Sequence, residues 1–214
     1  MTEHRIHFNF EGRFYALGVP GPSIKKIWFV LHGHGHLAQF FIKKFEILDD
    51  GNNLVIAPEG LNRYYLQGFS GKVGSTWMTK EDRLTDIGNY IRFLDTVYSA
   101  VVNFKDLNPE IITFLGFSQG AATVSRWAIQ GSVHFDRLIL WSGIYPPDMD
   151  FDLANKILSR KKVITVFGQS DEFLTEERWK EFLLLEKKLG IETQKISFQG
   201  GHEINEPTLQ SLVD

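Results

Sequence analysis

Residues 116–120 read Gly-Phe-Ser-Gln-Gly, which places a serine between two glycines. The G-x-S-x-G pattern makes a sharp turn when an apolar strand precedes it and a helix follows, because small residues let the two backbones approach closely. The apolar run 110–117 and the helical pattern 121–130 supply that context. We therefore predict that Ser118 is a nucleophile. The alternative is a glycine-flanked turn in which this serine only caps the helix.

A serine hydroxyl needs a base to take its proton and a carboxylate to orient that base. When the serine sits on a turn of this type, the acid and then the histidine follow it along the chain. His202 comes after the last apolar run, and Asp171 comes after the run before it. We predict that His202 is the base and Asp171 the acid. Glu172 is the nearest competing acid, and helix capping is the alternative role for Asp171.

Attack on a carbonyl also requires backbone N–H groups that bind the developing oxyanion. We predict that one donor is the amide of Gln119, at the start of the helix. The second is expected from the loop His-Gly-His-Gly-His at 32–36, and we assign it to the amide of His34.

The same loop supports a competing hypothesis, in which His32, His34 and His36 bind a metal. The glycines between them suit a tight turn, and no acidic residue lies close to the run. We therefore expect neither a metal nor a cofactor. The expected role of His32 is to hold the loop by hydrogen bonds, while His34 and His36 line the entrance.

The elements that position these groups alternate along the chain. Apolar runs at 26–31, 53–57, 110–117, 138–141, 162–167 and 195–198 predict the strands of a buried parallel sheet. Helical patterns lie between them, with one face made of Phe40, Phe41, Phe45 and Leu48, another made of Ile87, Ile91, Leu94, Tyr98 and Val101, and further helices over 121–130 and 174–189. Each candidate residue follows a strand, at the edge where such sheets bind ligands. An opening hairpin is predicted from 4–9 and 14–17.

The long connection 59–80 contains many aromatic residues and three glycines. Connections of this length carry specificity when they lie over the ligand-binding edge of a sheet. We predict that it walls an apolar acyl or aryl pocket, with Tyr145 contributing from a later loop and Ser142 forming the floor. The predicted substrate contacts from the connection are Tyr65, Phe69, Trp77 and Met78. The alternative is that these side chains only pack the connection against the body.

Length and composition set limits on the whole chain. The 214 residues suffice for one domain, 1–214, and the net charge of −3 gives no electrostatic footprint for nucleic acid. The absence of cysteine excludes a thiol nucleophile and disulfides. There is no apolar signal core and no apolar run long enough to span a membrane. Taken as a whole native chain, the sequence predicts a cytoplasmic protein without stable membrane insertion, either a monomer or a homodimer.

The sequence resembles the phospholipase/carboxylesterase family of α/β-hydrolases, which includes acyl-protein thioesterases. The similar segments are 31–35, 75–77, 116–120, 142–143, 168–171 and 201–204, with GFSQG the most specific. The resemblance implies a mostly parallel central sheet with helices on both faces and little or no lid. It also implies a Ser118–His202–Asp171 triad that hydrolyses a small-molecule ester or thioester through an acyl-enzyme, without a cofactor. The sequence departs from the family pattern at His34, His36 and Met78-Thr79, positions that the resemblance places at the substrate mouth. A serine peptidase or amidase on the same fold, and a non-catalytic binding protein, remain as alternatives.

Overall fold

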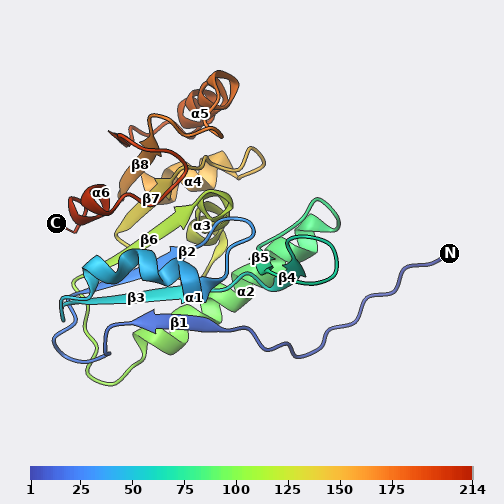
Figure 1. The fold of residues 1–214 in the computed structure, drawn as a ribbon, viewed down its shortest axis with the longest axis horizontal. Coiled ribbons are helices and arrows are strands. Elements are labelled where there is room, and N and C mark those ends of the chain that lie inside the picture. The colour runs from blue at the N-terminus through green and yellow to red at the C-terminus, as the bar shows by residue number, and fades with distance from the viewer. Residues whose placement is uncertain (214) are drawn as a thin grey trace.

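The computed structural model describes residues 1–213 and is built around a seven-stranded sheet (Figure 1). In spatial order the strands are β1 (Phe14–Leu17), β3 (Asn53–Pro58), β2 (Lys26–Leu31), β6 (Ile111–Phe117), β7 (Arg137–Trp141), β8 (Lys162–Gly168) and β9 (Gln194–Phe198). Every neighbouring pair is parallel except β1 and β3. The central strands are apolar on both faces, as strands covered on both sides must be.

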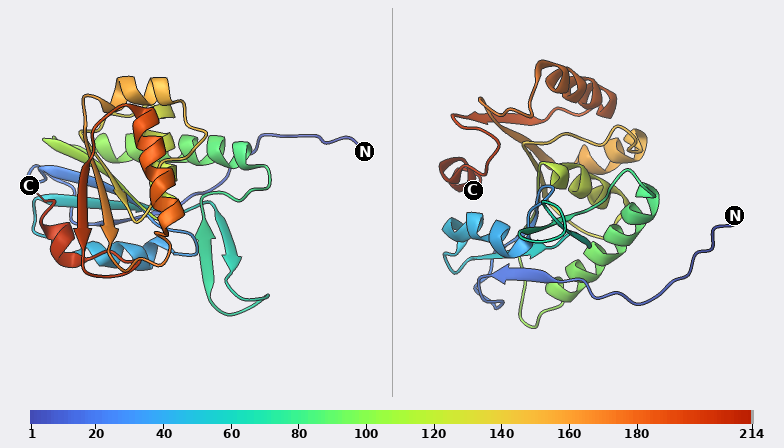
Figure 2. Two further views of the ribbon diagram at one scale, coloured as in Figure 1. Left: turned by 90° about the horizontal axis from the view of Figure 1, so that it is seen from above. Right: turned by 45° about the vertical axis from the view of Figure 1, so that its right-hand side comes forward.

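Helices cover both faces of the sheet, as Figure 2 shows. One face packs against α1 (Ala38–Phe41), the 3-10 helix η1 (Ile42–Leu48) and α6 (Glu206–Gln210). The opposite face packs against α2 (Arg83–Val102), α3 (Gln119–Gln130), α4 (Phe151–Leu158) and α5 (Glu176–Leu189). The predicted fold class, a mostly parallel α/β sheet with helices on both sides, is confirmed. Over residues 1–213, none of the helices is both long enough and apolar enough to span a membrane.

The strand register brings the candidate residues to one edge. Leu31 pairs with Gly116, Phe117 with Trp141, and Gly168 with Phe198, so that neighbouring strands end at similar heights. The loops that follow β2, β6, β7, β8 and β9 therefore emerge together. The hydrogen bonds between parallel strands fix this alignment, because a strand that shifted by one residue would move its side chains to the wrong face of the sheet.

The predicted opening hairpin is wrong. Residues 1–13 contain no strand and run as an extended segment away from the body in Figure 1, with Ile6, Phe8 and Phe10 exposed. Residues 14–17 do form a strand, but β1 pairs with β3 at the edge of the main sheet. A two-stranded hairpin without a core to cover is marginal, whereas the free edge of β3 offers hydrogen bonds on an existing framework.

The connection after β3 contains a second, two-stranded sheet that the sequence analysis missed. Strands β4 (Asn62–Tyr65) and β5 (Val73–Thr76) pair antiparallel and project from the body as a hairpin, which Figure 2 shows in its left view. The predicted helical face at 40–48 is also partly wrong. Phe41, Phe45 and Leu48 are buried, but Phe40 is largely exposed, because adjacent residues of an α-helix point about 100° apart and Phe41 already faces the core.

Candidate active site

Ser118 occupies the turn between β6 and α3 with φ 56° and ψ −117°, outside the regions that non-glycine residues favour. Two positions that pack closely around this turn, 116 and 143, have room only for glycine. A Cβ on Gly116 would lie 2.1 Å from the carbonyl oxygen of Gly120, and a Cβ on Gly143 would lie 2.5 Å from the carbonyl oxygen of Ser118. The Ser118 N–H donates to the Trp141 carbonyl at 2.9 Å, which fixes the turn to the adjacent strand. The sequence around the serine therefore forms the strained strand-to-helix turn that the motif predicts.

His202 and Asp171 are in direct contact. The Nδ1 atom of His202 lies 2.9 and 3.0 Å from the two carboxylate oxygens of Asp171, which also accepts the Phe173 N–H at 2.9 Å. The rings of Phe117 and Phe173 pack against the imidazole, with centroids 4.8 and 4.6 Å away. Asp171 is buried and does not cap the next helix, because Thr175 caps α5 instead. An imidazole held this way presents its other nitrogen, Nε2, for proton transfer.

A cavity of about 420 Å³ connects these groups. Ser118, Asp171 and His202 all line it, together with Gln119, Ala122, Ser142, Gly143, Ile144, Phe173, Leu174 and Arg178. Within residues 1–213 no hydrogen bond joins the Ser118 hydroxyl to His202. Ser118 therefore shares a cavity with His202 and Asp171 but does not bind either side chain. Such contacts are often loose in unliganded enzymes and tighten with substrate.

A second serine, Ser142, which the sequence analysis placed on the floor of the substrate pocket, lines the same cavity as Ser118. Its backbone is also left-handed, with φ 49°, and its N–H donates to the Val166 carbonyl at 2.8 Å. Its hydroxyl is buried and has no hydrogen-bond partner among the described residues. Because this hydroxyl oxygen is inaccessible, it cannot reach a substrate carbonyl in the cavity.

The loop 32–36 passes alongside the nucleophile, since a Cβ on Gly33 would lie 3.1 Å from the Cβ of Ser118. His32 is fully buried beneath this loop. Its Nδ1 lies 2.7 Å from the Gly33 carbonyl oxygen, and its Nε2 accepts the Gly60 N–H at 2.9 Å. Burial lowers the pKa of His32 to about 4. The ring is therefore neutral near pH 7, with the proton on Nδ1, and it holds the loop by hydrogen bonds as expected.

This arrangement orients the peptide between Gly33 and His34. The Gly33 carbonyl is bound by His32 and by the His36 N–H at 3.2 Å. In a trans peptide the C=O and N–H bonds point in opposite directions, so the His34 N–H points away from the buried ring. No acceptor within the described chain binds this N–H. It is therefore free to bind an oxygen.

Gln119 begins α3, where the first backbone N–H groups have no partner inside the helix. Its side chain is anchored away from the backbone amide: the Oε1 atom accepts the Trp77 N–H at 3.2 Å, and Nε2 donates to the Met78 carbonyl at 3.0 Å. The side chain thus ties the end of β5 to the nucleophile turn. Among the described residues the backbone N–H of Gln119 has no acceptor, and this N–H is the donor that the sequence analysis assigned to the oxyanion.

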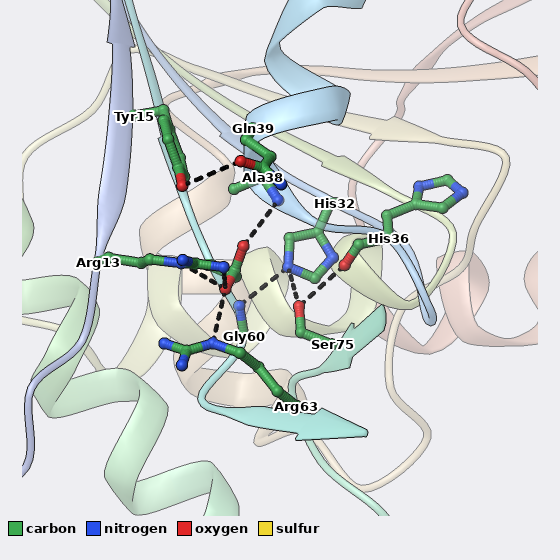
Figure 3. A network of polar contacts seen from close by, with 10 residues as sticks. Arg13, Tyr15, His32, His36, Ala38, Gln39, Gly60, Arg63 and Ser75 are labelled. Atoms are coloured by element: carbon green, nitrogen blue, oxygen red, sulfur yellow. Dashed lines mark hydrogen bonds and ion pairs between the residues drawn. The ribbon is translucent and has the colours of Figure 1, made fainter. Parts of the chain in front are cut away.

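The sequence analysis missed a buried carboxylate, Glu59, whose partners Arg13, Arg63 and Ala38 lie near His32 in Figure 3. Glu59 is almost completely inaccessible and accepts from Arg13 at 2.7 Å, from Arg63 at 2.9 Å and from the Ala38 N–H at 3.2 Å. Ser75 adds a bond to the His36 carbonyl at 2.9 Å. The only signal in the sequence was an acidic residue directly after an apolar strand, which alone predicts no partner.

The three histidines of the loop have separate partners. The His34 Nε2 lies 2.6 Å from the Tyr64 hydroxyl, whereas the His36 ring stacks on Phe117 with centroids 5.7 Å apart. Burial, and to a lesser degree the charge of Lys44, lowers the pKa of His36. The described residues contain no group of three or more histidine, aspartate or glutamate side chains placed to hold a metal ion.

Two of the predicted substrate contacts lie in the core, away from the cavity. Trp77 stacks on His32 with centroids 5.0 Å apart and donates its indole N–H to the His32 carbonyl at 2.8 Å. Tyr145 is fully buried and stacks on Phe182, and this burial raises the pKa of its hydroxyl. Large aromatic rings bury more apolar surface inside than at a rim, which explains their positions.

The other predicted contacts do not line the cavity either. Tyr65 and Phe69 are exposed on the β4–β5 hairpin, and Met78 packs against the core. The connection does wall a cavity, but a different one of about 530 Å³, which shares no lining residue with the cavity of Ser118. Its apolar lining comes from Leu37, Phe40, Phe41, Leu66 and Val73, with Lys44 and Lys72 also present. The projecting hairpin carries its side chains away from the nucleophile.

Comparison with known proteins fits this geometry. The model of the serine hydrolase (FSH1) family matches residues 24–213. No curated protein sequence matches the chain significantly. Among solved structures, the esterase PE8 is 22% identical with a TM-score of 0.66, covering 94% of each chain. Acyl-protein thioesterase 2 of Zea mays is 18% identical with a TM-score of 0.70, covering 94% of this chain and 96% of that one.

A phospholipase/carboxylesterase of Dyadobacter fermentans is 17% identical with a TM-score of 0.67, covering 96% of each chain. At these identities the likeness concerns the fold, and it confirms the α/β-hydrolase architecture that the sequence motifs implied. The family model carries more, because it spans the nucleophile turn, the Asp171 loop and the His202 loop together. The chain therefore belongs to the FSH1 family of serine hydrolases.

Proposed function

We propose that this serine hydrolase cleaves carboxylic esters or thioesters through an acyl-enzyme, with Ser118, His202 and Asp171 as its catalytic triad. The observation that carries the proposal is the contact between His202 and the Asp171 carboxylate on the wall of a cavity that also contains Ser118 in a strained turn. A serine, an oriented imidazole and a buried carboxylate are the parts that nucleophilic acyl transfer requires.

In the first step His202 takes the Ser118 proton on Nε2 while the serine oxygen attacks the substrate carbonyl. The backbone N–H groups of His34 and Gln119 bind the resulting oxyanion, and Asp171 stabilises the imidazolium through Nδ1. The C–O or C–S bond then breaks, and His202 gives its proton to the departing alcohol or thiol. Water repeats the sequence on the acyl-enzyme, releasing the acid and restoring Ser118.

The proposed substrates are small molecules. Similar folds belong to an esterase, a phospholipase/carboxylesterase and an acyl-protein thioesterase, so oxygen and sulfur leaving groups both fall within the proposal. The walls contributed by Ala122, Ile144, Phe173 and Leu174 are apolar and suit carbon chains or rings.

The test is hydrolysis of p-nitrophenyl esters from acetate to palmitate, and of the matching thioesters, by wild type and Ser118→Ala. We expect turnover that falls at least about a thousandfold in the variant, because the oxyanion donors and binding retain only a residual rate. An alkyl fluorophosphonate should label wild type but not Ser118→Ala. Ser142→Ala is the matched control, since Ser142 is also strained and lines the same cavity, and labelling should persist there.

Three results would contradict the proposal. Turnover of peptide anilides with none of esters would indicate a peptidase or amidase. Absence of both turnover and phosphonate labelling would indicate a binding protein. Activity that survives in Ser118→Ala and is lost with EDTA would indicate a metal-dependent reaction at the loop 32–36.

A further inference from the structure

The cavity of Ser118 contains a cation that the proposed reaction does not use. Arg178, on the first turn of α5, lines it together with Phe173 and Leu174. Among the described lining residues the other charged or titratable groups are Asp171 and His202, which bind each other. Arg178 thus supplies the permanent positive charge of the cavity wall, because a guanidinium does not lose its proton in proteins.

The guanidinium of Arg178 uses only part of its hydrogen-bonding capacity. Its Nη1 atom donates to Glu181 Oε2 at 2.7 Å, one turn along the same helix, and Glu181 does not line the cavity. No other side-chain contact of Arg178 occurs in the described part of the chain. A guanidinium has five N–H donors in a planar fork, so donors remain for a second oxygen-bearing partner. The side chain is 48% exposed and therefore accessible to a ligand.

Ala122, Ile144, Phe173 and Leu174 give the cavity of Ser118 an apolar wall beside Arg178. The Asp171 carboxylate, 1% exposed, binds His202 and the Phe173 N–H, and among the described residues it makes no contact with Arg178. The chain as a whole is negative, with a net charge of −3, and gives no general attraction for anions. Attraction for an anion would therefore be specific to this wall.

We propose that the substrate is an ester or thioester that carries an anionic group, such as a second carboxylate, and that Arg178 binds this group. The inference rests on the proposed function, because it places the anionic group of the substrate in the cavity that holds the nucleophile. Arg178 is a specificity-determining residue: it touches the substrate away from the reacting carbonyl and selects among esters of equal reactivity.

The test compares length-matched neutral and anionic substrates. On the acyl side the pair is p-nitrophenyl hexanoate and mono-p-nitrophenyl adipate; on the alcohol side it is pentyl butyrate and the butyrate ester of 5-hydroxypentanoate. For at least one pair, Arg178→Met should lower the ratio of kcat/KM for the anionic over the neutral ester by about tenfold, the value of one charge-assisted hydrogen bond. Neutral esters should lose much less kcat/KM than anionic ones, and the wild-type ratio should fall as salt is added.

Lys180→Met is the matched control, because Lys180 lies on the same helix, pairs with Glu176 and does not line the cavity. It removes the same net charge and should leave the ratio unchanged. Glu181→Gln releases Arg178 from its partner and should raise the ratio. The proposal is overturned if Arg178→Met leaves both ratios unchanged, or if Lys180→Met lowers them equally.

A binding measurement separates this inference from the proposed function. Calorimetric titration of Ser118→Ala with adipate and with hexanoate needs no turnover. Tighter binding of adipate that disappears in Ser118→Ala/Arg178→Met supports the site even if no ester is hydrolysed. Equal binding of the two acids, with esters turned over normally, refutes the anionic-substrate inference and leaves the proposed hydrolase intact.

Discussion

Replacing His32 with glutamine should change how the stability of the protein depends on pH. The His32 ring is fully buried and neutral, and burial lowers its pKa from 6.5 to about 4. Between these two values the unfolded chain binds a proton at this position that the folded protein does not. Stability that depends on neutral His32 is therefore complete above pH 6.5 and is lost as the pH falls through the folded-state pKa.

The size of the effect follows from the pKa difference. Linkage of one group with these two pKa values makes the free energy of unfolding about 2 kcal/mol smaller at pH 5 than at pH 7. The full loss below pH 4 is ~3 kcal/mol, a large share of the stability of a typical domain. Glutamine does not titrate, and its side-chain oxygen can accept the Gly60 N–H that His32 now accepts at 2.9 Å.

The assay is urea unfolding of wild type and His32→Gln at pH 7 and pH 5. The fall in unfolding free energy should be smaller in the variant by about 2 kcal/mol, since other titrating groups contribute equally to both proteins. His36→Gln is a second test of the same reasoning: burial lowers the pKa of His36 as well, so this variant should also show a smaller fall in unfolding free energy than wild type. Equal pH dependence in wild type and His32→Gln, or an NMR titration of His32 with a midpoint near 6.5, would refute the reasoning.

The remaining predictions concern the supports of the site. Gly116→Ala should abolish activity and cooperative unfolding seen by circular dichroism, because its Cβ would lie 2.1 Å from the Gly120 backbone oxygen; a folded, active variant would contradict the turn geometry. Glu59→Gln should lower the unfolding free energy in urea by about 1–3 kcal/mol through weakened bonds to two arginines and the Ala38 N–H, and unchanged stability would contradict this. Ser142→Gly should raise Tm, because glycine adopts the left-handed backbone at this position without strain and the variant lacks the unpaired buried hydroxyl. Together these two effects are worth about 1 kcal/mol or more, and a lower Tm would indicate that the Ser142 hydroxyl has a hydrogen-bond partner.

Much of the fold follows from local pattern. The strands predicted at 26–31, 53–57, 110–117, 138–141, 162–167 and 195–198 all occur, with bounds that differ by one residue at most. Buried parallel strands are readable because both of their faces are apolar, so that the signal does not depend on which residues face which helix. The exposed segment 4–9 was predicted wrongly as half of a hairpin, and the hairpin at 62–76 was missed, because a strand of a hairpin forms only where it finds a strand to pair with.

The candidate triad could be predicted because its order follows from the topology. A serine in a glycine-flanked turn, then an acid and a histidine after later strands, must meet when parallel strands end at one edge. The substrate contacts could not be predicted in the same way. Trp77 and Tyr145 have the composition of a pocket wall but are core residues, whereas Phe173 and Arg178 line the cavity without any motif.

The sequence by itself determined which candidate residues follow which strands. It also determined where glycine is needed for two backbones to approach each other. Only the tertiary structure decided that the His32 ring is fully buried and neutral, which carboxylate is buried near the loop and which charge faces the cavity. His32 binds the Gly60 N–H, Glu59 binds Arg13, and Arg178 lines the same cavity as Ser118, and in each case the two residues are far apart in the sequence. The physical reason is that burial and electrostatic environment are properties of the packed assembly, whereas periodicity and turn geometry are properties of the local chain.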